Sequence, residues 1–221
     1  MYIKHLKGFK YPDAELIRYF FKNNLDKTPQ KVLELGSNNG NNLSLFASYG
    51  YEAIGVELDA TSIKNANFNF KNIYKFKNYS FINADMRDFA RSTKGIKADI
   101  LLIPNVINYI TKHDFTELLS NLRQNQAMGG GSRLFLRARS TKDHRYGLGK
   151  MIEDNTFLLD SDEFSGENGL ICACYSQSEL VEILKQKLNL RNFTLITSEN
   201  LNVKNGVYIK DSDIIIYGEI N

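Results

Sequence analysis

Residues 31–42, Lys-Val-Leu-Glu-Leu-Gly-Ser-Asn-Asn-Gly-Asn-Asn, constrain the fold more than any other part of the chain. They predict a short buried strand over 32–35, a turn over 36–40 and a helix that begins at Asn41. Gly36 is expected to form the tight turn. Gly40 is expected where the backbone comes closest to a ligand, because glycine has no side chain to hold the two apart. The free N–H groups of the helix start then point at that ligand. The segment therefore predicts a binding turn at the carboxyl end of a strand.

The spacing of the glycines separates two kinds of binding turn. A dinucleotide-binding fold has G-x-G-x-x-G, whereas this chain has Gly36-x-x-x-Gly40 with Glu34 two positions before the first glycine. The pattern resembles motif I of class I S-adenosylmethionine-dependent methyltransferases, (D/E)-x-G-x-G-x-G. Asn38 replaces the middle glycine, and Asn tolerates positive φ better than other non-glycine residues. The resemblance implies that Glu34, Gly36, Ser37, Asn38 and Gly40 bind the cofactor, S-adenosylmethionine.

Two acids follow at the ends of the next predicted strands. Glu57 ends a strand that starts at Glu52, and it lies about 20 residues after Gly36, where a carboxylate at a strand end can accept both ribose hydroxyls. Leu58 beside it is also expected at the cofactor. In the resembled family the acid at Asp85 accepts a hydrogen bond from the adenine amino group, and Met86 lies against the ring. A carboxylate and a thioether suit those two contacts.

The exit of the fourth predicted strand narrows the class of acceptor. The apolar run 100–103 suits a central parallel strand buried on both faces. It is followed by Pro-Asn105-Val-Ile-Asn-Tyr109, which is not the (N/D/S)-P-P-(Y/F/W) motif of base-directed enzymes. Methylation of adenine or cytosine is therefore disfavoured. The stretch is similar to the N-V-(L/I)-x-(Y/H) pattern of small-molecule methyltransferases, which implies a cofactor contact for Asn105 and an acceptor contact for Tyr109.

The remaining pattern completes a doubly wound α/β fold in a single domain over 1–221. Apolar spacing predicts helices over 60–70, 113–126 and 178–188, with Ser176 or Ser178 as the last helix's cap. The glycine run 129–131 is expected to turn into a strand over 133–139. Strands over 193–198 and 213–219, joined by a loop over 200–211, are expected to form a hairpin. The resemblance thus implies a seven-stranded, mostly parallel, Rossmann-like sheet whose last strand is antiparallel.

The first 28 residues are expected to cover the cofactor site as an N-terminal cap segment. Residues 1–12 are basic and aromatic, and Pro12-Asp13 opens an amphipathic helix. In the resembled fold such a helix covers the ligand, so Tyr11 is a candidate contact to the acceptor. An ordinary packing role for this aromatic ring is the alternative.

Residues 140–175 form an insertion, which we call the acceptor lid because a minimal fold would not contain it and long loops are usually functional. Six Lys or Arg residues lie within 133–150, and six acids without a base lie within 153–167. One interpretation is that the two halves pair with each other. The other is a basic pocket in which Arg139 and Arg145 anchor a phosphate or carboxylate of the acceptor.

His144 and Asp143 are the candidates for a catalytic base in the lid. A hydroxyl acceptor needs a base, which contributes about 10²–10⁴-fold to the rate, and an adjacent carboxylate can orient an imidazole. The alternative for His144 is an exposed loop histidine.

Composition limits the partners. A net charge of +3 is too small to argue for nucleic acid. Cys172 and Cys174 lack further ligands at zinc spacing, so they are expected to be buried thiols, and no metal is expected. The sequence has neither a secretory leader nor an apolar run long enough for a membrane span, so a cytoplasmic location is expected. The protein is expected to be a monomer or a homodimer, and the sequence does not choose between the two.

These features together predict O-methylation of a small, polar, anionic metabolite such as a sugar nucleotide or phosphorylated sugar, with the methyl group taken from S-adenosylmethionine. The stretches 143–157 and 8–13 resemble a bacterial group of methyltransferases whose members mostly have unassigned acceptors. The chain is also similar to tellurite-resistance and thiopurine-type small-molecule methyltransferases. A thiol, chalcogen or carboxylate acceptor, which needs no base, is an alternative. An RNA base and a non-catalytic partner subunit are further alternatives.

Overall fold

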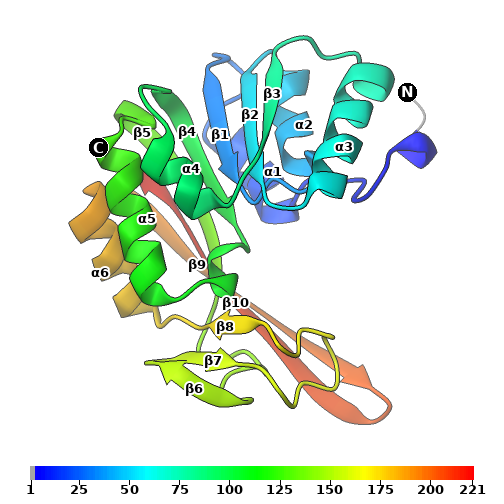
Figure 1. Ribbon diagram of the computed structural model, residues 1–221, viewed down its shortest axis with the longest axis vertical. Helices are drawn as coiled ribbons and strands as arrows, with labels where there is room; N and C mark the ends of the chain where they lie inside the picture. The colour runs from blue at the N-terminus through cyan, green and yellow to red at the C-terminus, as the bar shows by residue number, and fades with distance from the viewer. Residues whose placement is uncertain (1–2) are drawn as a thin grey trace.

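One seven-stranded sheet organises the computed structural model, which describes residues 3–221 (Figure 1). Its strand order is β3-β2-β1-β4-β5-β10-β9. Neighbours are parallel from β3 to β5, and β10 is antiparallel to both β5 and β9. The strands are β1 (Lys31–Leu35), β2 (Glu52–Glu57), β3 (Tyr79–Asn83), β4 (Ala98–Pro104), β5 (Met128–Arg139), β9 (Arg191–Lys204) and β10 (Val207–Glu219). The predicted fold class is confirmed.

Helices cover both faces of this sheet, and the apolar residues divide accordingly into two clusters. Two helices, α1 (Ala14–Lys22) and α2 (Asn41–Ser48), cover one face of the sheet. The helix α3 (Ala60–Phe68) continues into the π-helical segment η2 (Asn69–Tyr74), whose Phe70 packs in the same apolar cluster. The other face carries α4 (Met86–Ser92), α5 (Lys112–Gln124) and α6 (Gln177–Leu188). β4 lies between the layers and is buried on both sides. Within residues 3–221, no helix has the length and apolar character to cross a membrane.

Side-chain caps fix where the functional helices begin. Asp13 accepts hydrogen bonds from the backbone N–H groups of Glu15 and Leu16, so α1 starts directly after the Pro12-Asp13 pair that predicted it. Ser176, one of the two expected candidates, caps α6 in a capping box with Glu179. The short segment η1 (Ile3–His5) precedes α1.

The hairpin of β9 and β10 is much longer than the sequence analysis predicted. The expected loop over 200–211 is wrong, because both strands continue through it with unbroken pairing as far as Val207 opposite Lys204. Only Asn205 and Gly206 remain in the turn, at φ +52° and +81°. Asn-Gly with both residues at positive φ is the favoured two-residue hairpin turn. The glycine run at 129–131 also belongs to a strand, since β5 begins at Met128 with a bulge opposite β4.

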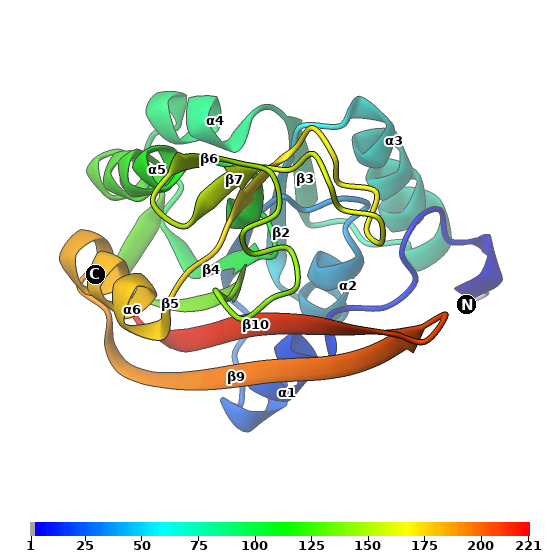
Figure 2. The same ribbon diagram turned by 90° about the horizontal axis from the view of Figure 1, so that it is seen from below.

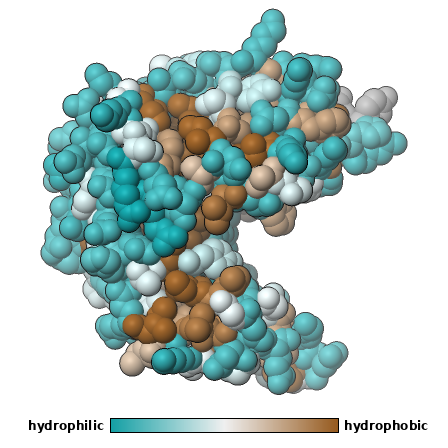
Figure 3. Space-filling view, in the orientation of Figure 1, coloured by the Kyte–Doolittle hydropathy of each residue, from teal (hydrophilic) through white to brown (hydrophobic). Residues whose placement is uncertain are grey.

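The insertion over 140–175 has structure of its own. It contains a small antiparallel sheet of β6 (Lys150–Glu153), β7 (Thr156–Leu158) and β8 (Ile171–Ala173). This sheet and the far end of the hairpin project together from the main sheet (Figure 1). Seen from below, β9 and β10 run side by side along the hairpin (Figure 2). The space-filling view shows the molecule hollowed between this projection and the lobe that carries β1–β3 (Figure 3). Since the insertion follows the carboxyl end of β5, it lies on the side where parallel-sheet proteins bind ligands.

Candidate functional site

The predicted glycine turn lies at the carboxyl end of β1, and both glycines are required there. Gly36 has φ +69°, and a Cβ on it would lie 2.6 Å from Cγ2 of Val106. Gly40 has φ +76°, caps α2, and a Cβ there would lie 2.7 Å from the ring of Phe70. Asn38 has φ +46°, in keeping with its place in the motif. Both glycines are therefore required by the packing of Val106 and Phe70 against the turn, while Gly36 and Asn38 line the adjoining cavity.

Glu57 ends β2 directly beside this turn. Its Oε2 accepts a hydrogen bond from the backbone N–H of Asn38, and its Oε1 one from that of Asp59, each at 2.9 Å. These two bonds fix the carboxylate, and each oxygen keeps a lone pair for a further donor. Asp59 in turn caps α3. Leu58 is 68% exposed and lines the same cavity as Glu57.

Asp85 and Met86 follow β3 and reach the opposite wall of that cavity. Asp85 caps α4, and its carboxylate accepts hydrogen bonds from the Arg87 side chain, at 3.0 Å from Nε and 2.7 Å from Nη2. This pairing with Arg87 lowers the pKa of Asp85. Arg87 also contacts Asp114 at 2.7 Å. Arg87 lines the cavity but was missed in the sequence analysis; its position two residues after the acid was the available signal.

Two adjoining cavities of about 300 and 600 Å³ form one groove along the carboxyl ends of β1, β2 and β4. They share four lining residues: Gly36, Glu57, Val106 and Tyr109. The smaller cavity contains Asp85 and Met86, and the larger one contains Asn38 and Asn105. The groove therefore brings together most of the residues expected at the cofactor.

Glu34 and Ser37 lie behind the groove rather than in it. Glu34 is buried; its Oε1 accepts a hydrogen bond from Asn42 at 2.7 Å, and its Oε2 has no hydrogen-bond partner among residues 3–221. Burial raises the pKa of Glu34 to about 8. The Ser37 hydroxyl is also buried and faces Gly55. Neither side chain lines either cavity, so any contact of these two positions with a cofactor is indirect or through the backbone.

The N-terminal cap segment closes one side of the larger cavity, as far as the described residues 3–28 show. Phe9 and Tyr11 line this cavity, and the segment is fixed because Asn39 exchanges two hydrogen bonds of 2.9 Å with the backbone of Phe9. Tyr11 is 66% exposed, and its carbonyl oxygen accepts a hydrogen bond from Asn41. The ring is thus not a core residue, and a ligand in the cavity can contact it.

Tyr109 connects the groove to the lid. It ends η3 (Ile107–Tyr109), which follows β4, and its hydroxyl donates a hydrogen bond to Glu167 of the lid at 2.9 Å. Arg139, at the end of β5, lies 3.0 Å from the same carboxylate, and its guanidinium carbon lies 5.9 Å from the centre of the Tyr109 ring. Two of the four residues predicted at the acceptor, Tyr109 and Arg139, therefore adjoin each other.

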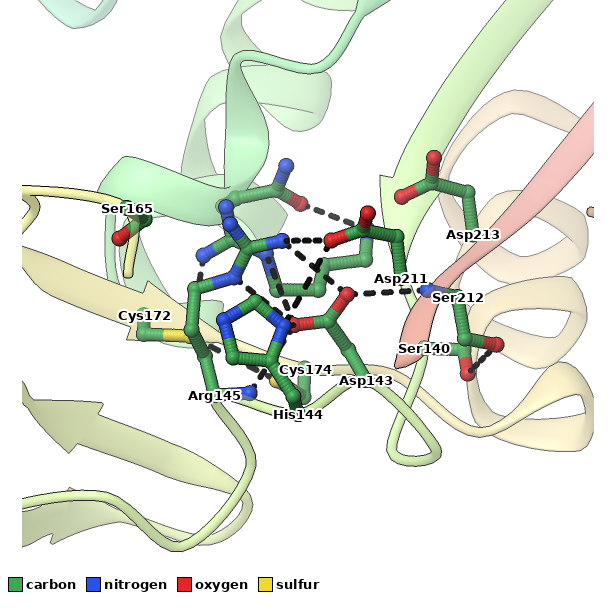
Figure 4. A network of polar contacts seen from close by, with 12 residues as sticks. Ser140, Asp143, His144, Arg145, Ser165, Cys172, Cys174, Asp211, Ser212 and Asp213 are labelled. Atoms are coloured by element: carbon green, nitrogen blue, oxygen red, sulfur yellow. Dashed lines mark hydrogen bonds and ion pairs between the residues drawn. The ribbon is translucent and has the colours of Figure 1, made fainter. Parts of the chain in front are cut away.

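Asp143 and His144 lie away from the groove and hold the lid to the hairpin (Figure 4). Asp143 is 4% exposed; it accepts hydrogen bonds from Nε of Arg145 at 2.8 Å and from the backbone N–H of Ser212 at 2.9 Å. Nδ1 of His144 lies 3.5 Å from Asp211. Among residues 3–221, neither member of the pair lines either cavity. A catalytic role for the pair stays a prediction, which this placement does not favour.

The donor atoms of Asp143, His144 and Asp211 come within 4.8 Å of one another, close enough for a metal ion. The guanidinium of Arg145 lies between the two carboxylates, 2.8 Å from Asp143 and 3.3 Å from Asp211. It supplies the positive charge that a cation would bring, so we assign no metal to this cluster.

The two cysteines are buried thiols, as predicted. Their sulfur atoms lie 3.7 Å apart, and Arg139 donates a hydrogen bond to Cys172 at 3.1 Å. The thiol of Cys174 lowers the pKa of Cys172 to about 7, aided by Arg139 and opposed by burial.

Comparison with known proteins agrees with this arrangement. Residues 32–130 match the family described as a methyltransferase domain. No curated protein matches the chain. An S-adenosylmethionine-dependent methyltransferase from Methanosarcina mazei has a similar structure (TM-score 0.68, 17% identity, 94% of this chain and 98% of that one covered). TehB from Haemophilus influenzae is also similar, with a TM-score of 0.64 and 16% identity over 95% of this chain and 62% of that one. The N-terminal domain of EvdMO1 with S-adenosylhomocysteine bound has a TM-score of 0.63 and 16% identity over 96% of this chain and 83% of that one.

Residues 32–130, just under half of the chain, match a methyltransferase domain, and the sheet order is that of the S-adenosylmethionine-dependent methyltransferase fold. S-adenosylmethionine is the cofactor that this domain and this fold indicate for the groove. The residues fit this cofactor: Gly36 and Asn38 of the glycine turn line the groove, and Glu57 is fixed at a strand end beside them.

Proposed function

We propose that this enzyme methylates an oxygen of a small, polar, anionic metabolite. The observation that carries the proposal is the junction at Tyr109, which lines the cofactor groove on one side and adjoins the buried guanidinium of Arg139 on the other. An acceptor anchored by an anionic group at Arg139 would extend past Tyr109 toward the groove. A sugar nucleotide or phosphorylated sugar fits this description, as does a sugar or hydroxy acid with a carboxylate.

Different groove residues would bind different parts of S-adenosylmethionine. Glu57 would accept the ribose hydroxyls, and Met86 and Leu58 offer apolar contact to the adenine ring. Backbone groups of the glycine turn would face the amino-acid part, in the larger cavity. Bound S-adenosylmethionine supplies a methyl group on a sulfonium that is already activated. The protein's contribution is therefore mainly to place the acceptor in line with that group.

A thiol, chalcogen or carboxylate acceptor is the second candidate. Such acceptors need no general base, and no histidine lines either cavity of the groove among the described residues. Among residues 3–221, two carboxylates line the larger cavity: Glu57, and Asp13, which caps α1 and contacts Arg137. A hydroxyl acceptor would have to lose its proton to one of these acids, to Tyr109 or to water.

Calorimetric titration with S-adenosylhomocysteine tests the cofactor site. Glu57→Ala should weaken binding about a hundredfold, because it removes a charged acceptor of two hydrogen bonds. Glu52→Ala is the matched control, since it removes the acid at the opposite end of the same strand. Equal affinity of the Glu57 variant and the control would contradict the assignment. Once binding is established, phosphorylated, nucleotide-linked and carboxylated sugars should be compared as acceptors by methyl transfer.

A further inference from the structure

Glu167 is the one lid carboxylate that reaches the groove's edge. It belongs to the loop between β7 and β8 and is 17% exposed at its side chain. Its Oε1 accepts the hydrogen bond of the Tyr109 hydroxyl at 2.9 Å and lies 3.3 Å from Nη2 of Arg139. Its Oε2 is buried, accepts no hydrogen bond among residues 3–221, and lies 3.0 Å from Nη2 of Arg139 and 3.8 Å from Nη1 of Arg145. A carboxylate thus already fills the place beside Tyr109, held there by the Tyr109 hydroxyl and by the ion pair with Arg139.

Arg139 gives this place its preference for an anion. Its side chain is 5% exposed, and a buried guanidinium requires a compensating negative charge. Its hydrogen-bonded partners within residues 3–221 are Glu167 and the thiol of Cys172. The carboxylate of Asp143 lies farther away, at 3.8 Å. If Glu167 moved away, the guanidinium would need another anion, and Tyr109 another acceptor.

The place suits a carboxylate, because Glu167 already presents one to Tyr109 and Arg139. Around it, Arg139 and Arg145 lie beside Asp143 and Asp211, and the thiol of Cys172 contacts Arg139. A monoanionic carboxylate from outside would replace Glu167 charge for charge, whereas a doubly charged phosphate would add one more negative charge in a buried place.

The loop is built so that Glu167 can leave without unpacking the lid. Gly166 and Gly169 flank it at φ +73° and +85°, and no atom lies within 4 Å of the position of a Cβ on either glycine. The base of the loop is held by backbone hydrogen bonds between Leu159 and both Gly169 and Leu170. The backbone of Glu167 donates to the Ser165 hydroxyl and accepts from the Leu170 N–H. A rotation of the Glu167 side chain alone would thus leave β7 and β8 in place.

We propose that Glu167 occupies the acceptor's anion subsite as an internal stand-in, and that a carboxylate of the acceptor displaces it to bind Arg139 and Tyr109. This inference rests on the proposed function and deepens it, because it names a carboxylate rather than a phosphate as the acceptor's anchoring group. The anchoring carboxylate is distinct from the atom that receives the methyl group.

Benzoate binding to the full chain saturated with S-adenosylhomocysteine tests the proposal. Calorimetry should compare wild type with Glu167→Ala and with Glu163→Gln, which changes an exposed acid of the same loop. Removal of an intramolecular competitor should tighten benzoate binding about tenfold or more in Glu167→Ala. Neutral benzamide and inorganic phosphate should not gain affinity. Adding Tyr109→Phe to Glu167→Ala should weaken benzoate again, as should Arg139→Lys if that variant folds.

The outcomes separate this inference from the proposed function. Equal benzoate affinity in wild type and Glu167→Ala, or no benzoate binding to either, would overturn the inference. If Glu167→Ala increased the affinity for phosphate as much as the affinity for benzoate, the choice of a carboxylate as the anchoring group would be overturned. S-adenosylhomocysteine is titrated first and separately, so its failure to bind would overturn the proposed function instead.

Discussion

Gly36 and Val106 meet across the floor of the cofactor groove so closely that a Cβ on the glycine would lie 2.6 Å from Cγ2 of the valine. Gly36 ends β1, and Val106 follows β4, the strand that pairs beside it. The contact therefore ties the glycine turn of motif I to the segment that leads into Tyr109. It makes Gly36 a position at which both the backbone conformation and the space exclude a side chain.

Gly36→Ala should destabilise the protein by about 2–4 kcal/mol, because it adds an overpacked methyl group to the strain of a positive φ. Gly95→Ala is the control: Gly95 has φ +64° but open space around its Cβ position, so it should lose only the smaller backbone contribution. Adding Val106→Ala to Gly36→Ala should recover part of the difference. Urea unfolding measures all four proteins, and equal losses for Gly36→Ala and Gly95→Ala would show that Val106 yields without cost.

The sheet could be predicted from the sequence because its signals are local. The run 100–103 is apolar on both faces, and motif I carries its own turn chemistry in Gly36, Asn38 and Gly40. The hairpin was predicted too short, although Leu201 and Val203 before the turn, and Val207 and Ile209 after it, already alternate as in a strand. A strand that projects from the sheet needs little burial, and the Asn205-Gly206 turn was the stronger local signal.

The lid could not be predicted in the same way, because pairing of charges depends on three-dimensional proximity. The sequence showed basic and acidic stretches but not which members meet. The structure pairs Arg139 with Glu167 of the acidic stretch, while Arg145 pairs with its near neighbour Asp143 and with Asp211 of the hairpin. Asp211 lay in the expected loop, so its part in the cluster had no signal in the sequence.

Glu34 should make stability depend on pH. Its pKa is raised by burial to about 8 from an ordinary value near 4.5, so the folded state keeps a proton that the unfolded state releases. Its stabilising effect is complete below the unfolded pKa and is lost as pH rises through the folded one. The free energy of unfolding should thus fall between pH 4.5 and 8, with a slope of up to about 1.4 kcal/mol per pH unit.

The Glu34→Gln variant isolates this contribution, since glutamine can still accept the hydrogen bond from Asn42. Urea unfolding should be measured for wild type and Glu34→Gln across that pH range. The difference between their free energies of unfolding should change with pH. Glu52→Gln, on the next strand and only partly buried, should follow wild type. If the free energy of unfolding changed with pH equally in wild type and in Glu34→Gln, Glu34 would be ionised in the folded protein.

Asp143 and His144 should affect the lid rather than the chemistry. Asp143→Asn removes the buried partner of Arg145 and should cost about 3–5 kcal/mol, measured by urea unfolding. Asp88→Asn, which removes an exposed ion pair with Arg91, should cost less than about 1 kcal/mol. His144→Gln should leave S-adenosylhomocysteine affinity unchanged in calorimetry. If His144→Gln folds normally yet abolishes transfer to an acceptor, the imidazole is the base after all.

Cys172 should be a thiolate in the folded protein near neutral pH. The thiol of Cys174 and the guanidinium of Arg139 lower its pKa to about 7, against an ordinary value near 9. Because the folded pKa is the lower one, the stabilising contribution is complete above the unfolded pKa and is lost as pH falls through about 7. The ultraviolet thiolate absorbance of the native protein should therefore titrate near pH 7 and vanish in Cys172→Ser. Cys174→Ala removes the donor and should clearly raise the pH midpoint of this titration. Cys174→Ser keeps a hydroxyl donor, so any shift of its midpoint reports how much less well the hydroxyl donates than the thiol. A native midpoint near 9, equal to that of the unfolded chain, would show that Arg139 is neutralised by Glu167 alone.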